Sequence, residues 1–228
     1  MRNLCIIPAR GGSKRIPRKN VKPFMGKPII AYSIEAALQS GLFEEVMVST
    51  DDEEIAEIAK QYGAKVPFMR SEETSNDFAG TDDVLLEVLE EYKKRGKIFD
   101  FLCCLYSTAP FVSSIRIVDA YNQLNPQVDY VFTCVAYSYP VQRGLHIVDG
   151  KMCMVHPEYF DARTQDLETI YHDAGQFYFA RISSYSKERT LWGKNTKGLI
   201  LSELEVQDLD TITDWTLAEM KYQLLHKK

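Results

Sequence analysis

The sequence predicts an α/β fold in which helices cover both faces of a mostly parallel β-sheet. Short apolar runs typical of buried strands alternate with helical patterns through residue 137, and such alternation is typical of βαβ units. The run 101–105 is apolar throughout, as expected of a central strand buried on both faces. The chain of 228 residues is long enough for one such domain with a substantial core.

Apolar spacing and helix-stop residues define the expected elements. Ile30, Ile34 and Leu38 repeat at helical spacing between Pro28 and Gly41, which begin and end a helix. The same reasoning applies along the chain. Strands are expected at 4–7, 46–48, 65–68, 101–105 and 130–137, and helices at 28–40, 51–62, 81–92, 115–124 and after 211.

Four consecutive acids, residues 51–54, open the second expected helix. A metal site is one interpretation of this run. A helix start explains it more simply, with Asp51 as the N-cap, Glu54 at the third helical position, and the acids favoured by the helix dipole.

Residues 138–171 interrupt the regular pattern. They contain many aromatic residues and turns and show no clean helical period, so they indicate an irregular or β-rich segment. We therefore expect a single domain, 1–228, with an inserted lobe at 138–171.

Composition excludes several classes of protein. Apolar content of 45% and charged content of 26% are ordinary for a globular domain, and no apolar run reaches the roughly 18 residues of a membrane span. The five cysteines are odd in number and form no C-x-x-C pair. Together with an N-terminus that lacks a signal-peptide pattern, they predict a reduced, cytoplasmic protein without membrane partners.

A basic, glycine-containing loop follows the first strand. It runs from Pro8 to Asn20 and carries five cations between Arg10 and Lys19. Glycines let backbone amides approach a ligand closely, and such amides bind phosphate together with Arg and Lys side chains. The first 34 residues contain eight Lys or Arg and no acid, although the chain carries a net charge of −5.

This contrast predicts a local polyphosphate site rather than a nucleic-acid surface, which needs a broad basic patch. A solvated basic loop is the alternative interpretation. Two common phosphate motifs do not fit: Pro28 follows Gly26-Lys27 where a P-loop needs Ser or Thr, and Pro17 interrupts the helix that a dinucleotide fingerprint opens.

The loop resembles the signature of the CMP-sugar-acid cytidylyltransferases, which join CTP to a sialic-type acid and release pyrophosphate. The matching residues are Pro8-Ala9-Arg10-Gly11-Gly12-Ser13-Lys14-Arg15-Ile16-Pro17, followed by Lys19 and Asn20. Later motifs extend the match over most of the chain. The resemblance implies a three-layer, Rossmann-like fold of the nucleotide-diphospho-sugar transferase type, and a homodimer whose contacts come from the 138–171 lobe.

The resemblance also implies which residues hold CTP. Arg10, Lys14 and Lys19 are expected to hold the triphosphate and Asn20 to contact the nucleotide sugar. Arg70, Asp77 and Thr81 resemble a loop that borders the cytosine, although Ser71 replaces the family's usual Pro. The expected nucleotide-binding residues are Ala9, Arg10, Gly11, Gly12, Ser13, Lys14, Lys19, Asn20, Arg70, Asp77 and Thr81.

Departures from the sialic acid pattern concern the acceptor. Tyr106 and Val112 replace a Gln and an Arg in the turn after the central strand. Residues 172–178 read H-D-A-G-Q-F-Y where sialic acid members show R-P-N-G-A-I-Y, and this stretch resembles the pseudaminic acid branch. Arg143 and Arg163 can each present a two-pronged guanidinium to the sugar carboxylate. The expected acceptor-binding residues are Tyr106, Thr108, Arg143, Arg163, Gln165, His172, Asp173, Gln176 and Tyr178; for His172 and Asp173 a structural polar pair is the alternative.

Two acids near the C-terminus suggest a metal site. Asp208 and Asp210 lie two positions apart, and in an extended chain such side chains point to one face. Mg²⁺ usually takes one or two carboxylates together with substrate phosphates and water, and Mn²⁺ is a possible substitute. The family's I-D-I-D motif matches Asp208 and Asp210 as metal ligands, whereas Thr211 and Asp214 form a capping box.

The predicted reaction is transfer of CMP from CTP to the anomeric hydroxyl of a nine-carbon sialic-acid-like sugar, with pseudaminic acid as the expected acceptor. Arg10, Lys19 and Asp208 are the expected catalytic residues, and Asp208 is the candidate base. Two alternatives stay open. The acceptor could be N-acetylneuraminic, legionaminic or 3-deoxy-octulosonic acid, or the chain could be a nucleotide-sensing module without turnover.

Overall fold

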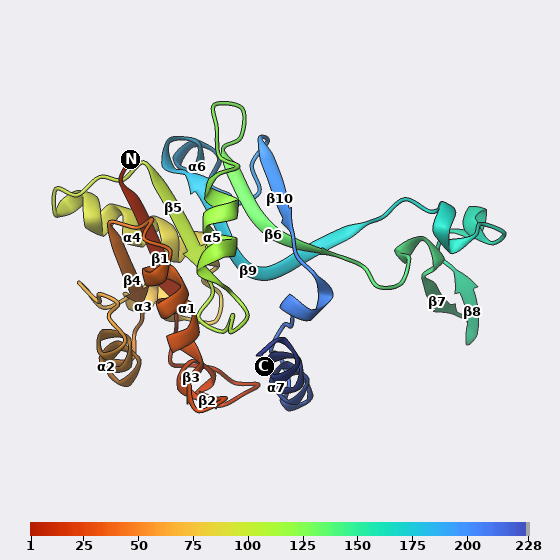
Figure 1. Ribbon diagram of the computed structural model, residues 1–228, viewed down its shortest axis with the longest axis horizontal. Helices are drawn as coiled ribbons and strands as arrows, with labels where there is room; N and C mark the ends of the chain where they lie inside the picture. The colour runs from red at the N-terminus through yellow and green to blue at the C-terminus, as the bar shows by residue number, and fades with distance from the viewer. Residues whose placement is uncertain (227–228) are drawn as a thin grey trace.

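A six-stranded sheet forms the centre of the chain in the computed structural model, which describes residues 1–226 (Figure 1). The strands are β1 (Asn3–Pro8), β4 (Glu45–Ser49), β5 (Phe101–Leu105), β6 (Tyr130–Ala136), β9 (Tyr171–Arg181) and β10 (Thr196–Ile200), in the spatial order β10-β6-β9-β5-β1-β4. Strand β9 is antiparallel to β5 and β6, while the other neighbouring pairs are parallel. The predicted mostly parallel α/β sheet is confirmed.

Helices cover both faces of this sheet, as predicted. On one face lie α1 (Ile29–Gln39), α2 (Glu53–Gln61) and α5 (Ser114–Tyr121), and on the other α4 (Thr81–Lys94) and α6 (Ile182–Glu188). Strand β1 contributes Cys5 and Ile7 to the first core and Leu4 and Ile6 to the second. Because successive side chains of a strand point to opposite faces, a strand buried on both sides must be apolar throughout, as this one is.

A third apolar cluster joins the C-terminal helix to the basic loop. Helix α7 (Ile212–His226) contributes Trp215 and Ala218, which pack with Ile16 of the loop and with Leu209. The small hairpin of β2 (Pro23–Phe24) and β3 (Lys27–Pro28) adds Phe24 to this cluster. The last part of the chain is thereby fixed beside the loop that follows the first strand.

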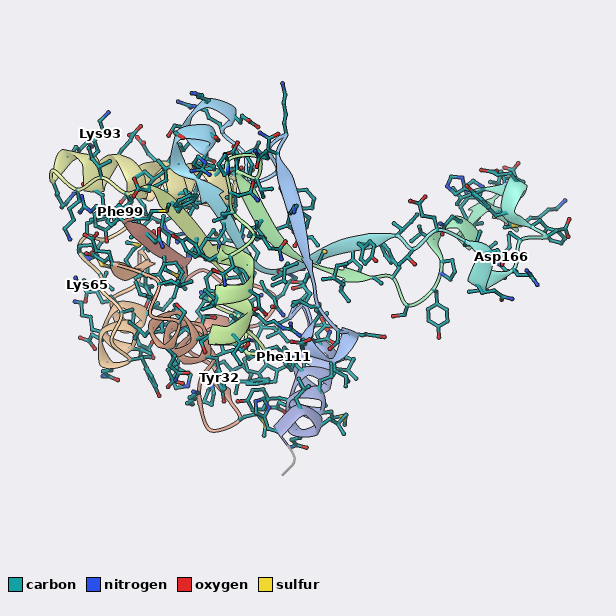
Figure 2. All side chains as sticks on the ribbon, turned by 45° about the horizontal axis from the view of Figure 1, so that its top comes forward. Tyr32, Lys65, Lys93, Phe99, Phe111 and Asp166 are labelled. Atoms are coloured by element: carbon teal, nitrogen blue, oxygen red, sulfur yellow. The ribbon has the colours of Figure 1, made fainter. Side chains whose placement is uncertain are left out.

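Residues 137–170 form a lobe that projects from the sheet between β6 and β9 (Figure 1). The lobe contains the hairpin of β7 (Leu145–Val148) and β8 (Lys151–Met154) and three short turns, η2 (Val141–Arg143), η3 (Pro157–Tyr159) and η4 (Thr164–Asp166). Asp166 is labelled near its far end in Figure 2. Among the large apolar side chains of the lobe, Leu145, Ile147, Met152 and Phe160 are 60–70% exposed.

Two local predictions are corrected, and one element was not predicted. Residues 65–68 form no strand: only Lys65 bridges to Met47 at the sheet edge. Asp52, not Asp51, is the N-cap of α2, because its side chain accepts the Ile55 N–H. Strand β9 continues past residue 178 as an antiparallel member of the central sheet, which the local pattern did not indicate.

The remaining short elements are η1 (Lys19–Val21), α3 (Glu72–Ser75) and η5 (Glu203–Glu205). Gly80 is the N-cap of α4, and Thr81 is its first residue. The predicted capping box of Thr211 and Asp214 is present. The five cysteines are free, and no helix within residues 1–226 is long and apolar enough to cross a membrane.

Candidate active site

The basic loop is closed on itself by a buried amide. Asn20, the middle residue of η1, donates from Nδ2 to the Arg10 carbonyl at 2.8 Å and accepts the Ser107 hydroxyl at 2.9 Å. The loop begins at Ala9, whose N–H donates to the Ser49 carbonyl at 2.9 Å. Because β1, β4 and β5 are parallel, their carboxyl ends meet at this edge, where open α/β sheets bind ligands.

A cavity of about 570 Å³ lies inside this edge and is strongly cationic. Its charged lining residues are Arg10, Lys14, Arg15, Lys19 and Arg70, and no acid lines it within the described part of the chain. Polar lining comes from Ser13, Asn20, Thr81, Tyr106, Ser107 and Thr108. Cavities of this size hold small-molecule ligands, and five cations around one cavity suit a polyanion such as a triphosphate.

Two of these cations are held rigidly. Lys19 donates from Nζ to the Leu209 carbonyl at 2.8 Å, and burial lowers the pKa of its ammonium, while the nearby Asp210 and Asp208 carboxylates oppose that shift. Arg70 is buried and donates to the Ser49 hydroxyl and carbonyl. Burial also lowers the Arg70 pKa. Both charges therefore keep fixed positions in the cavity wall.

Two other cations share one counter-ion. Asp77 accepts from Arg10 Nη1 at 3.0 Å and from Lys14 Nζ at 2.5 Å. These two cations hold the pKa of the Asp77 carboxyl below its usual range, Lys14 making the larger contribution. The carboxylate of Asp77 therefore lies on the cations expected to hold the triphosphate.

The two acids of the C-terminal segment flank a buried leucine. Leu209 is 1% exposed and packs in the cluster with Ile16 and Trp215, so Asp208 and Asp210 on either side of it are kept near the surface. Asp210 pairs with Arg15 at 2.6 Å. Arg15 and Lys19 line the cationic cavity, and Lys19 donates to the carbonyl of Leu209 between the two acids, so the pair lies beside that cavity.

These acids fit only an incomplete metal shell. The described residues contain no group of three or more His, Cys, Asp or Glu that could hold a metal ion. Mg²⁺ takes one or two carboxylates when phosphate and water oxygens complete its coordination. The donor set of Asp208 and Asp210 therefore suits a magnesium ion that binds together with a phosphorylated ligand.

A second cavity of about 350 Å³ adjoins the first, because Tyr106 and Thr108 line both. Its polar lining residues are Asp173, Gln176, Tyr178, Gln207 and Asp208. The Tyr178 hydroxyl donates to Asp173, and burial is the largest cause that raises the Tyr178 pKa. Hydroxyl, amide and carboxylate groups are thus concentrated beside the cationic cavity, as a polyhydroxylated acceptor requires.

The structure brings most predicted residues together. Five of the expected acceptor residues line this second cavity, namely Tyr106, Thr108, Asp173, Gln176 and Tyr178. Ala9, Gly11 and Gly12 belong to the loop but do not line the first cavity, and neither does Asp77, which pairs with Arg10 and Lys14. Sequence reasoning missed Ser107 and Gln207, although each adjoins a predicted residue, and it did not assign Arg15 to the site despite counting its charge.

Four expected acceptor residues lie elsewhere. Arg143, Arg163 and Gln165 lie in the lobe and line neither cavity. Arg163 pairs with Asp166 at 2.6 Å, near the far end of the lobe (Figure 2). His172 lines a third hollow of about 320 Å³ with Trp192 and Phe132, which Asp173 also reaches. Within one chain the lobe arginines therefore cannot serve the acceptor cavity, because the lobe extends away from the sheet.

Comparisons with known proteins agree with this geometry. A family model described as Cytidylyltransferase matches residues 4–192. The pseudaminic acid cytidylyltransferase of Campylobacter jejuni is 42% identical over 229 residues, covering all of this chain and 99% of that protein. The CMP-N,N'-diacetyllegionaminic acid synthase of Legionella pneumophila is 35% identical, covering 98% and 97%. A solved CMP:2-keto-3-deoxy-manno-octonic acid synthetase complexed with CTP matches the whole chain with a TM-score of 0.70 at 19% identity, which supports the fold.

Proposed function

The chain belongs to the cytidylyltransferase family, and on that basis we propose that it transfers CMP from CTP to the anomeric hydroxyl of pseudaminic acid. The observation that carries the chemistry is the junction of a cationic cavity with a polar one at Tyr106 and Thr108. CTP occupies the first cavity and the sugar the second, so that the two reactants meet at this junction. The 42% identity with a full-length pseudaminic acid cytidylyltransferase supports the choice of acceptor.

The reaction is an in-line displacement. The anomeric oxygen attacks the α-phosphorus of CTP, a new O–P bond forms, and the bond to the bridging oxygen breaks as pyrophosphate leaves with its electron pair. Arg10, Lys14 and Lys19 stabilise the charge that builds on the leaving group. Asp208 lines the acceptor cavity, and we assign to it the proton of the sugar hydroxyl.

Asp208 and Asp210 are also the residues that would hold Mg²⁺, or Mn²⁺ in its place. The bound ion would supply Lewis-acid polarisation of the phosphate and orient the reactants. Ser13 lines the CTP cavity and offers its hydroxyl to the triphosphate, Asn20 contacts the ribose, and Arg70 and Thr81 border the base. The Ala9 and Gly11 amides are bound to Ser49 and Asp51 and shape the loop instead, and Asp77 is the counter-ion that the triphosphate displaces from Arg10 and Lys14.

The lobe leads us to propose a homodimer. Its exposed apolar side chains need a cover, and a second copy of the chain supplies one, as the resemblance to the CMP-sugar-acid cytidylyltransferases implies. Each copy would then deliver Arg143, Arg163 and Gln165 to the acceptor cavity of the other, where the arginines bind the sugar carboxylate. We place the protein in the cytoplasm, consistent with its free cysteines.

Pyrophosphate release from CTP and Mg²⁺ tests this function. We expect release with pseudaminic acid, and far less with N-acetylneuraminic, legionaminic or 3-deoxy-octulosonic acid. A site built to hydrogen-bond particular groups rejects analogues that leave those groups unpaired. Release with none of these acceptors, despite CTP binding, would favour a nucleotide-sensing module instead.

A further inference from the structure

The turn that follows β4 holds the basic loop, residues 8–20, in place. In this 49–52 turn, the Ser49 carbonyl accepts the Ala9 N–H at 2.9 Å and an Arg70 N–H at 2.5 Å. The Thr50 carbonyl accepts the Arg70 backbone N–H at 2.8 Å. Backbone groups of one turn therefore fix both the start of the loop and a buried cation of the cavity wall.

The two acids of the turn also contact the loop. Asp51 Oδ1 accepts the Gly11 N–H at 2.9 Å. Asp52 accepts from both terminal nitrogens of Arg18, at 2.5 and 3.1 Å, in a two-pronged ion pair, and Glu54 accepts from Arg18 as well. Such paired charge-assisted hydrogen bonds fix geometry as well as charge. The loop is thus attached to the turn near each of its ends.

Two backbone features indicate that these contacts determine the shape of the loop. Arg18 has a φ of 54°, in the left-handed region that a non-glycine residue keeps only where its surroundings enforce it. A Cβ on Gly11 would lie 2.7 Å from Asp52 Oδ2, so glycine is needed for the loop to approach the turn. Arg18 does not line the cationic cavity, whereas its neighbours Arg15 and Lys19 do.

We propose that Asp51, Asp52 and Arg18 are positioning residues for the triphosphate: the pair Asp52–Arg18 and the bond from Gly11 to Asp51 hold the loop so that Arg10, Lys14 and Lys19 face the cavity. The Arg18 guanidinium is occupied by Asp52 and Glu54 and does not bind phosphate. The role explains the acidic run at 51–54 without a metal ion. It rests on the proposed use of the loop for CTP and adds the residues that shape it.

One substitution separates positioning from helix capping. Asn is as good an N-cap as Asp, so Asp52→Asn keeps the bond from the Ile55 N–H but removes the ion pair with Arg18. Arg18→Gln removes the same pair from the other side, together with the contact to Glu54. Glu53→Gln is the matched control, because Glu53 lies in the same helical turn, is exposed, and makes no side-chain hydrogen bond or ion pair among the described residues.

Hydrogen exchange of the amides of residues 10–20 in the nucleotide-free full chain is the primary measurement. We expect Asp52→Asn and Arg18→Gln each to speed this exchange by about tenfold or more. The double variant should match Arg18→Gln, which loses the Glu54 contact as well, and Glu53→Gln should match wild type. With CTP and acceptor, KM for CTP should rise by about tenfold in the same variants while KM for the acceptor stays unchanged.

Unchanged exchange in either variant, or fully additive effects in the double variant, would overturn the positioning role. Because the exchange is measured without nucleotide or acceptor, its outcome does not depend on the proposed reaction. If the enzyme uses another acceptor, faster exchange in the variants still supports the positioning role. If exchange is unchanged in the variants, activity with pseudaminic acid does not restore that role.

Discussion

At the scale of single residues, the charges of the cationic cavity differ in what they do. Arg10 is partly exposed and shares Asp77 with Lys14, whereas Lys19 is bound to the Leu209 carbonyl and partly buried. A side chain already fixed in position loses little freedom when a ligand binds. The fixed cation Lys19 is therefore suited to orienting the triphosphate, while Arg10 and Lys14 must exchange one anionic partner for another.

Removal of either type of cation should reduce catalysis without unfolding the chain. A hydrogen bond to a charged group contributes on the order of 1.5–3 kcal/mol, so Arg10→Ala and Lys19→Ala should each lower kcat/KM for CTP by about tenfold to a hundredfold. Lys60→Ala, at the end of α2 and outside both cavities, is the control. Steady-state kinetics with wild-type values for Arg10→Ala and Lys19→Ala would show that the loop does not hold CTP.

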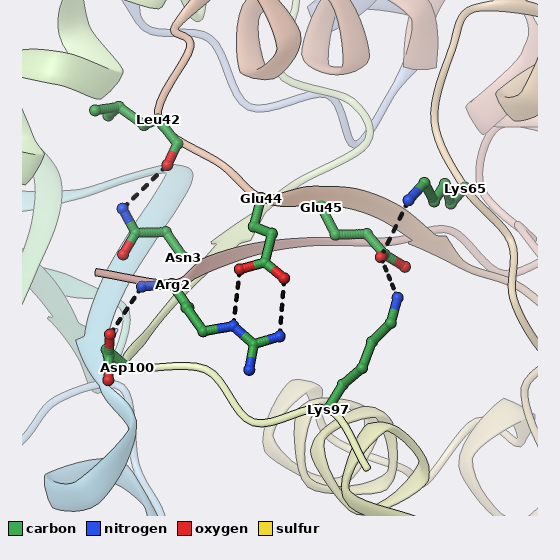
Figure 3. Close-up of polar contacts among 8 residues, drawn as sticks. All are labelled: Arg2, Asn3, Leu42, Glu44, Glu45, Lys65, Lys97 and Asp100. Carbon is green, nitrogen blue, oxygen red and sulfur yellow. Dashed lines mark hydrogen bonds and ion pairs between the residues drawn. The ribbon is translucent and has the colours of Figure 1, made fainter. Parts of the chain in front are cut away.

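A second residue-scale prediction concerns a buried carboxylate far from the site. Glu45 on β4 has a side chain 3% exposed and accepts from Lys97, Lys65 and Tyr92 (Figure 3 shows both lysines). Burial alone would raise the pKa of Glu45, but these partners outweigh burial and bring it below 4.5. A carboxyl group whose pKa is lower in the folded protein than in the unfolded chain stabilises the fold at pH values above its unfolded-state pKa. This contribution is lost as the pH falls through the folded-state pKa.

Glu45→Gln should therefore lower the free energy of unfolding by about 1–3 kcal/mol at pH 7, and this difference should shrink below pH 4.5. Urea unfolding at pH 7 and at pH 4 measures it. Glu44→Gln is the neighbouring control, since Glu44 pairs with Arg2 at the surface (Figure 3) and exposed pairs contribute little. An equal difference at both pH values would contradict the account of Glu45.

At the scale of elements, the segment between β10 and α7 connects the core to the proposed metal site. Leu209 is anchored in the cluster with Ile16 and Trp215, and the capping box of Thr211 and Asp214 begins α7 directly afterwards. This anchoring keeps Asp208 and Asp210 near Lys19. Two carboxylates make an incomplete shell for Mg²⁺, so metal binding should require nucleotide.

Asp208→Asn and Asp210→Asn should each cut turnover by about tenfold or more while leaving thermal stability nearly unchanged, because they remove anionic charge but keep shape. Turnover is measured against Mg²⁺ and Mn²⁺ concentration. Excess metal should restore part of the Asp210→Asn loss, and less of the Asp208→Asn loss if Asp208 also accepts the proton. Wild-type turnover of either variant at limiting Mg²⁺ would remove that residue from the site.

Elements also differ in how far the sequence predicts them. The alternation of strands and helices through residue 137 and the loop after β1 follow from local patterns, and both are confirmed in the fold. Residues 65–68 have a strand-like composition, yet only Lys65 bridges to Met47. Strand pairing depends on the backbone groups that the neighbouring strand β4 presents, and the local sequence does not specify them. The antiparallel direction of β9 depends on its pairing with β5 and β6. The choice of Asp52 over Asp51 as N-cap depends on contacts of both acids with the basic loop.

At the scale of the whole molecule, the lobe at 137–170 is the part that one chain does not explain. Its side chains Ile147 and Met152 are each 69% exposed, and the predicted acceptor residues Arg143 and Arg163 lie far from the acceptor cavity. The sequence indicated that these arginines could bind the sugar carboxylate, but in a single chain neither of them lines the acceptor cavity. A second copy of the chain would supply both a cover and a site.

We expect a homodimer whose contacts come from this lobe. Sedimentation velocity at micromolar concentration should give the dimer mass for wild type. Ile147→Asp combined with Met152→Asp should shift the protein toward monomer, because burying unpaired carboxylates is costly. Ile115→Asp, at an exposed position of α5 outside the lobe, should leave the mass unchanged. A wild-type monomer would contradict the dimer, and with it the supply of arginines between copies.

We propose that the two adjoining cavities select pseudaminic acid for activation by CTP. A competition assay tests it most directly: limiting CTP and Mg²⁺ are mixed with equal amounts of pseudaminic, N-acetylneuraminic and N,N'-diacetyllegionaminic acids, and the CMP-sugars are separated by mass and chromatography. Product ratios then report the ratios of kcat/KM. We expect CMP-pseudaminate in excess by about a hundredfold or more; comparable amounts of another CMP-sugar would show that these cavities do not select pseudaminic acid.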